Sequence, residues 1–68
     1  MRTELSKNIY NLRKEKNISQ LALAKEIGVT QKAIDFWEKD INEPKASYII
    51  KLATYFGVTS DYLLGLED

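Results

Sequence analysis

The stretch that decides the fold is residues 19–38, SQLALAKEIGVTQKAIDFWE. Its apolar side chains recur every three or four residues, which is the spacing of one face of an α-helix. The two faces consist of Leu23, Ala24 and Ile27, then Ala33, Ile34 and Trp37. Between them, Gly28 can end a helix in the left-handed conformation, and Thr30 can cap the start of the next. The stretch therefore predicts two helices joined by a tight turn.

The same reading extends over the rest of the chain. Apolar residues at helical spacing, caps and glycines predict helices over 4–16, 20–27, 31–38 or 39, 46–56 and 60–64, with Ser19 as N-cap of the second and Asn17 as C-cap of the first. No segment alternates apolar and polar residues as a strand would. We therefore expect an all-α, compact five-helix fold, a single domain over residues 1–68 with the helix-turn-helix at 19–38.

Composition excludes several classes of function. The 68 residues include no cysteine and no histidine, so disulfides, thiol chemistry and the usual zinc ligands are absent. There is no glycine-rich phosphate loop, and the carboxylates are spread over predicted helix surfaces. We expect no enzyme activity, no small-molecule substrate, no cofactor and no metal. The amphipathic start does not resemble a signal peptide, and no apolar run approaches the roughly 20 residues of a membrane span, so a cytoplasmic location is expected.

Charge is distributed unevenly along the chain. The net charge is zero, but residues 1–32 carry seven basic and three acidic side chains, whereas residues 33–68 carry three and seven. Such a chain can present a basic face to a partner while its total charge stays neutral. In a chain this short the asymmetry can also arise by chance, so it adds little weight.

The outer face of the predicted helix over 31–38 carries Gln31, Lys32, Asp35 and Phe36. An α-helix fits the DNA major groove, where glutamine can pair with adenine, lysine with guanine, and an aromatic edge with the thymine methyl. On composition alone, a merely solvated polar face is the simpler explanation. Phe36 shifts the balance, because an exposed aromatic on a short helix indicates a partner surface, unless it folds over a neighbouring loop.

At these spacings the chain resembles the lambdoid phage repressor and Cro family, also called the Xre family. The matching residues are Ser19-Gln20, Leu23-Ala24, Ile27-Gly28-Val29-Thr30, Ile34, Trp37-Glu38, Pro44, Ile49, Lys51-Leu52-Ala53, Phe56-Gly57-Val58-Thr59 and Asp61-Tyr62-Leu63-Leu64-Gly65. The resemblance covers nearly the whole chain. It implies a five-helix DNA-binding domain that acts as a homodimer, with the third helix in the major groove and the second across the DNA backbone.

The resemblance also implies a role for each matching site residue. Four residues would read bases, namely Gln31, Lys32, Asp35 and Phe36, of which Asp35 either contacts a cytosine amino group or stays solvated. Five would contact the DNA backbone, namely Gln20, Thr30, Lys39, Asn42 and Lys45. Arg13 and Glu38 would form a semi-buried salt bridge. The C-terminal apolar residues Tyr55, Tyr62, Leu63 and Leu66 would form the dimer interface, although ordinary core packing explains them about as well.

The chain also departs from the family pattern. Asp40 stands where glycine is common, Ile41 and Glu43 where basic residues are common, and Lys45 where Ser or Thr usually caps a helix. Acids beside a phosphate-binding loop should weaken attraction to DNA, so we expect modest affinity for an isolated monomer.

Two functional hypotheses follow. The first is a sequence-specific regulator of transcription, a repressor of phage or mobile-element type that binds a pseudo-palindromic double-stranded operator and is associated with the bacterial nucleoid. The second is a protein-interaction module, antitoxin-like or an adaptor, that keeps the fold without specific DNA binding. The neutral charge, the acids Asp40 and Glu43 and the apolar Leu21 favour the second.

Overall fold

The computed structural model describes residues 4–67. Within this range the chain forms five α-helices and no strand: α1 (Glu4–Glu15), α2 (Gln20–Ile27), α3 (Gln31–Glu38), α4 (Ala46–Phe56) and α5 (Ser60–Leu64). The predicted all-α, five-helix fold is therefore confirmed, with α1 ending one residue earlier than expected. None of the helices in the described range is both long and apolar enough to cross a membrane.

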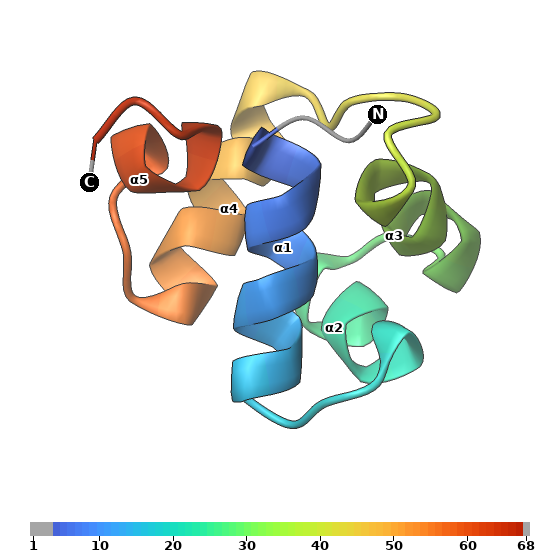
Figure 1. Cartoon of the computed structure of the whole chain (residues 1–68). Coiled ribbons are helices and arrows are strands. Elements are labelled where there is room, and N and C mark those ends of the chain that lie inside the picture. The colour runs from blue at the N-terminus through green and yellow to red at the C-terminus, as the bar shows by residue number, and fades with distance from the viewer. Residues whose placement is uncertain (1–3, 68) are drawn as a thin grey trace.

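Helix α1 lies at the centre of the arrangement (Figure 1). It packs against α3 on one side and α5 on the other, and α2 contacts both α3 and α4. The ten buried core side chains come from all five helices: Leu5, Ile9, Leu23, Ala24, Ile27, Ile34, Trp37, Leu52, Ala53 and Leu63. The α2–α3 pair is thus held in place by α1, which contacts α3, and by α4, which contacts α2.

The predicted caps fix the turn between α2 and α3. The Ser19 hydroxyl accepts a hydrogen bond from the backbone N–H of Ala22 at 3.0 Å, and the Thr30 hydroxyl accepts one from Ala33 at 3.1 Å. Gly28 takes φ +86°, in the left-handed region where glycine is favoured. Because both helix ends are satisfied locally, the angle between the two helices does not depend on a flexible linker.

Among residues 4–67, two residues other than glycine also take left-handed conformations. Asn17, the predicted C-cap of α1, has φ 58°, and Asp40, just after α3, has φ 59°. Asn and Asp tolerate this region better than most residues. The conformation of Asp40 gives a physical reason for the glycine that the family often carries there.

The loop after α3 is anchored at its far end. Pro44 is buried, and the ring of Trp37 lies 5.7 Å from that of Tyr48 in the first turn of α4. Lys45 occupies the N-cap position of α4 and makes no side-chain cap hydrogen bond there. The backbone at this helix start is therefore left open on its exposed side.

Helix α5 is short and is tied to α1. The side-chain amide of Asn8 donates to the backbone carbonyls of Tyr62 and Leu63, at 3.1 and 3.2 Å. Gly65 ends α5 at φ +81°, where a Cβ would lie 2.5 Å from the Cβ of Glu4. Both features require the C-terminal end of α5 to sit directly on α1.

Candidate nucleic-acid interface

A buried ion pair fixes α3 to α1. Arg13 donates from Nε and Nη2 to the two carboxylate oxygens of Glu38, at 2.6 and 3.0 Å, and from Nη1 to the backbone carbonyl of Ile18 at 2.9 Å. The hydrogen bond to Glu38 raises the pKa of the Arg13 guanidinium. Both side chains are almost fully buried, so the pair holds the C-terminal end of α3 at a set position on α1.

Gln20 extends this network to α2. Its Nε2 atom donates to Oδ1 of Asp35 at 3.2 Å and to Oε1 of Glu38 at 3.1 Å. A primary amide carries only two N–H donors, so both are used within the protein. The first residue of α2 is thereby linked to two successive turns of α3.

Asp35 is also engaged from the end of α3. Its Oδ2 atom lies 3.0 Å from Nζ of Lys39, one turn further along the helix. The hydrogen bonds from Lys39 and then from Gln20 lower the pKa of the Asp35 carboxyl. Asp35 is therefore an ionised acceptor with a protein partner on each oxygen, and neither partner was predicted from the sequence.

The start of α3 presents two exposed polar side chains. Gln31 and Lys32 are exposed, and both follow the Thr30 cap directly. Nζ of Lys32 lies 5.6 Å from the centroid of the Phe36 ring, a cation–π distance. Phe36 is half-buried, so it is less exposed than expected and supports the Lys32 stem.

Most side chains of the loop between α3 and α4 are exposed. Asn42 and Lys45, the predicted phosphate-contacting residues, are both exposed. So are Ile41 and Glu43 between the end of α3 and Pro44. Lys45 therefore shares this loop with two acids, the exposed Glu43 and the partly exposed Asp40. These acids reduce the attraction of the loop for phosphates.

The predicted dimer surface needs one correction. Leu63 has no solvent exposure and belongs to the core, so it was wrongly assigned to an interface. A helix of five residues is too short for periodicity to show which face is buried, and Leu63 faces the core beneath α1. Leu66 is 73% exposed, and Tyr55 and Tyr62 are partly exposed, so these three remain available to a partner.

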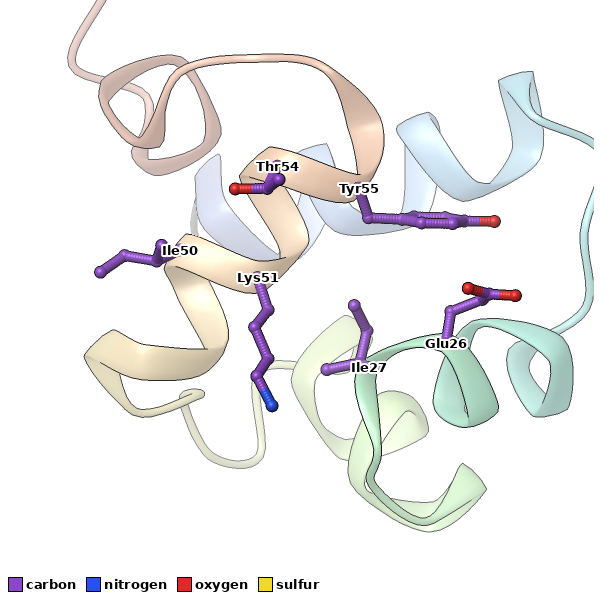
Figure 2. A pocket seen from close by; sticks show the side chains of 6 residues that line it. All are labelled: Glu26, Ile27, Ile50, Lys51, Thr54 and Tyr55. Atoms are coloured by element: carbon purple, nitrogen blue, oxygen red, sulfur yellow. The ribbon is translucent and has the colours of Figure 1, made fainter.

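An open groove of about 360 Å³ runs between α2 and α4 (Figure 2). Its lining consists of Glu26, Ile27, Ile50, Lys51, Thr54 and Tyr55. Figure 2 shows the Tyr55 ring extending over Glu26, with Ile50 pointing away from the other side chains. The groove shares Tyr55 with the predicted dimer surface and no residue with the predicted DNA-contacting set. In the described residues, no group of His, Cys, Asp and Glu side chains could hold a metal ion.

The resemblance implies that Gln20 braces the third helix as well as contacting phosphate, but it did not predict Asp35 and Lys39 as members of this link. Asp35 and Lys39 stand four residues apart, which is an ion-pair spacing on a helix, so this half had a signal. The contact between Gln20 and Asp35 joins two helices across the turn and depends on their crossing angle, for which no residue pattern gives a value.

With this geometry established, comparison with known proteins decides the family. A family model described as helix-turn-helix matches residues 9–63. The chain belongs to the helix-turn-helix family. The resemblance to the lambdoid phage repressors is confirmed, because a phage repressor is among the relatives.

Among the relatives is repressor protein C2 of Salmonella phage P22, which is 37% identical over 65 residues. Another is an uncharacterised helix-turn-helix transcriptional regulator, YqaE, of Bacillus subtilis strain 168, which is 32% identical over 63 residues. These alignments cover 94% and 93% of this chain but only 30% and 54% of the relatives. The chain thus spans at most about half of either relative.

A solved structure matches the fold over nearly its whole length. It is the P22 c2 repressor protein in complex with the synthetic operator 9T, with a TM-score of 0.88 and 31% sequence identity over 98% of this chain and 100% of that one. The helix-turn-helix fold that this chain adopts is therefore one that a relative uses when bound to operator DNA.

Proposed function

We propose that this chain binds double-stranded DNA in a sequence-specific manner and regulates transcription, with α3 in the major groove. The observation that carries the proposal is the start of α3, where Gln31 and Lys32 project from a helix held rigidly by its cap and by the Arg13–Glu38 pair. Family membership and the operator-bound relative support it.

In this proposal each side chain at the interface has one role. Gln31 pairs with an adenine, Lys32 with a guanine, and the edge of Phe36 packs on a thymine methyl. Gln20, Thr30, Lys39, Asn42 and Lys45 contact phosphates, which position the helix without reading sequence. No step of this function needs a catalytic residue, a cofactor or a metal.

We further propose a homodimer that acts as a repressor of phage type. Two copies would read half-sites about one helical turn apart, roughly 34 Å, so the operator would be pseudo-palindromic. The partly exposed Tyr55 and Tyr62 and the exposed Leu66 supply an apolar surface for the second copy. The relative from phage P22 is a repressor, which supports repression rather than activation.

The test is selection of bound fragments from a random DNA pool, followed by titration of the selected duplex. A consensus with two-fold symmetry is expected. The double variant Gln31→Ala, Lys32→Ala should lose about 2–6 kcal/mol of discrimination, because each base contact contributes about 1–3 kcal/mol. The control variant Asn11→Ala, Lys51→Ala removes an amide and a lysine from α1 and α4 and should keep the consensus.

A second candidate, protein binding without specific DNA recognition, is favoured by the groove between α2 and α4 and by Ile50, which is 59% exposed at its edge. If selection returns no consensus and the Gln31 and Lys32 changes have no effect on binding, this second candidate replaces the first.

A further inference from the structure

Two of the five side chains assigned to DNA phosphates are already bound to an anion inside the protein. Lys39 and Gln20 reach the two carboxylate oxygens of Asp35, at 3.0 and 3.2 Å. We infer that Asp35 is an internal substitute for a DNA phosphate, which holds Gln20 and Lys39 in the free protein and thereby weakens sequence-independent binding. This inference rests on the proposed function and adds a regulating residue to the same site.

The chemistry of the two acceptors is interchangeable. A carboxylate and a phosphate each offer anionic oxygens to N–H donors. The Lys39 side chain is 62% exposed and ends in a flexible, compact ammonium group, so it can turn from Asp35 to a phosphate without any movement of α3. The exchange replaces one ion pair by another. Lys39 therefore contributes less to the free energy of DNA binding than an unpaired lysine would.

Gln20 is constrained in a similar way. Both of its amide N–H groups are used, one on Asp35 and one on Glu38. A phosphate contact from this amide must therefore replace one of the two. The bond to Asp35 is the one to give way, because Asp35 is less buried than Glu38.

The arrangement affects all DNA sequences alike. Breaking the contacts to Asp35 has the same cost on every duplex, and it leaves the Asp35 carboxylate facing the DNA backbone. Only a duplex that also satisfies Gln31 and Lys32 offsets this cost with base contacts. Asp35 therefore lowers the occupancy of non-specific DNA, to which phosphate contacts contribute almost all of the affinity.

The experiment is a double-mutant cycle with Asp35→Asn and Lys39→Gln, measured on a duplex of mixed sequence. Asp35→Asn should strengthen binding roughly 3- to 10-fold and steepen the plot of log affinity against log salt by up to about 0.9, the value for one additional neutralised phosphate. In the Lys39→Gln background the same change should leave the salt slope unaltered, because the lysine that Asp35 holds is absent.

Glu43→Gln is the matched control, because it removes an exposed acid from the neighbouring loop. The inference is overturned if Asp35→Asn acts equally with and without Lys39, or no differently from Glu43→Gln, since the effect is then simple removal of negative charge. A readout in the free protein complements this: the side-chain resonances of Lys39 and Gln20 should move in Asp35→Asn and stay in Glu43→Gln. Thermal unfolding checks that each variant is folded.

The mixed-sequence duplex keeps two failures apart. If random-pool selection gives no consensus but the cycle shows coupling between Asp35 and Lys39, the proposed sequence-specific function fails and the inference about Asp35 stands. If selection gives a consensus but the effects of the two substitutions are additive, the inference about Asp35 fails and the proposed sequence-specific function stands. If the wild-type protein binds neither duplex, both are overturned.

Discussion

Glu38 is a single carboxylate that connects three helices. It accepts hydrogen bonds from Arg13 on α1 and Gln20 on α2 while it lies at the end of α3, and it is only 3% exposed. A buried carboxylate is costly unless its oxygens are paired. The pairing therefore specifies one arrangement of these helices rather than adding much net stability.

The variant Arg13→Met tests this role. It should lower the free energy of unfolding by about 3–5 kcal/mol, because it leaves the Glu38 charge buried without its main partner. The paired variant Arg13→Met, Glu38→Leu should recover most of the loss. Urea unfolding followed by circular dichroism gives both values, and Lys14→Met on the exposed side of α1 serves as control. An equal loss in the single and paired variants would contradict the argument.

Asp35 should make the stability of the fold depend on pH in the acidic range. Its pKa is lower in the folded chain, through Lys39 and then Gln20, so its stabilising effect is complete above the unfolded-state value of about 3.9. The effect is lost as pH falls through the lower folded-state value. Wild type should therefore be more stable than Asp35→Asn at pH 6, and this difference should shrink below about pH 4. A difference that stays constant between pH 6 and pH 2, measured by thermal unfolding, would argue against it.

At the scale of elements, contacts at the helix ends stabilise the short helix α5. Helix α5 has only five residues, too few to be stable alone. It persists because the Thr59 hydroxyl caps its start, because Asn8 holds its last carbonyls, and because Leu63 is buried. Its glycine end then allows the close approach to α1.

Gly65→Ala should be the most damaging glycine substitution of the three helix-end glycines. The added methyl group meets Glu4 at 2.5 Å in a backbone conformation that already disfavours alanine, so we expect a loss of about 2–4 kcal/mol. Gly57→Ala is the matched control: it has φ +71° but no atom within 4 Å of the added carbon, so only the backbone cost of about 1 kcal/mol applies. Equal melting temperatures for the two variants would contradict the steric part of the argument.

Most element boundaries were predictable, because caps and glycines act locally. The helices from Gln20, Ala46 and Ser60 begin where Ser19, Pro44 and Thr59 indicated. What escaped prediction depends on how the helices cross. The burial of Leu63 follows from packing between α5 and α1, which are far apart in the sequence. The contact between Gln20 and Asp35 follows from the crossing angle of α2 and α3. No spacing of residues along the chain encodes either.

At the scale of the whole molecule, the apolar surface divides into a core and a remainder. Leu63 and Leu66 are three residues apart, yet one is fully buried and the other is 73% exposed. Only the exposed residue can serve a second copy of the chain. This distinction gives a direct test of the proposed dimer.

Leu66→Glu should leave the melting temperature nearly unchanged, because surface substitutions usually alter stability by no more than about 0.5 kcal/mol. It should abolish self-association in sedimentation experiments and weaken binding to a two-half-site operator. Leu63→Glu should instead unfold the protein, because it places a charge in the core. If Leu66→Glu sediments as the wild type does, the dimer contact lies elsewhere.

The uncapped start of α4 affects which substitutions at Lys45 selection would retain. Replacing Lys45 by serine would supply the missing cap and stabilise the fold by about 1 kcal/mol, yet it would remove the one cation of the exposed loop around Pro44. A selection for heat resistance alone should therefore recover Lys45→Ser, whereas a selection that also demands operator binding should reject it. The lysine marks a position where robustness and DNA recognition compete for the same side chain, and laboratory evolution under the two regimes would separate them.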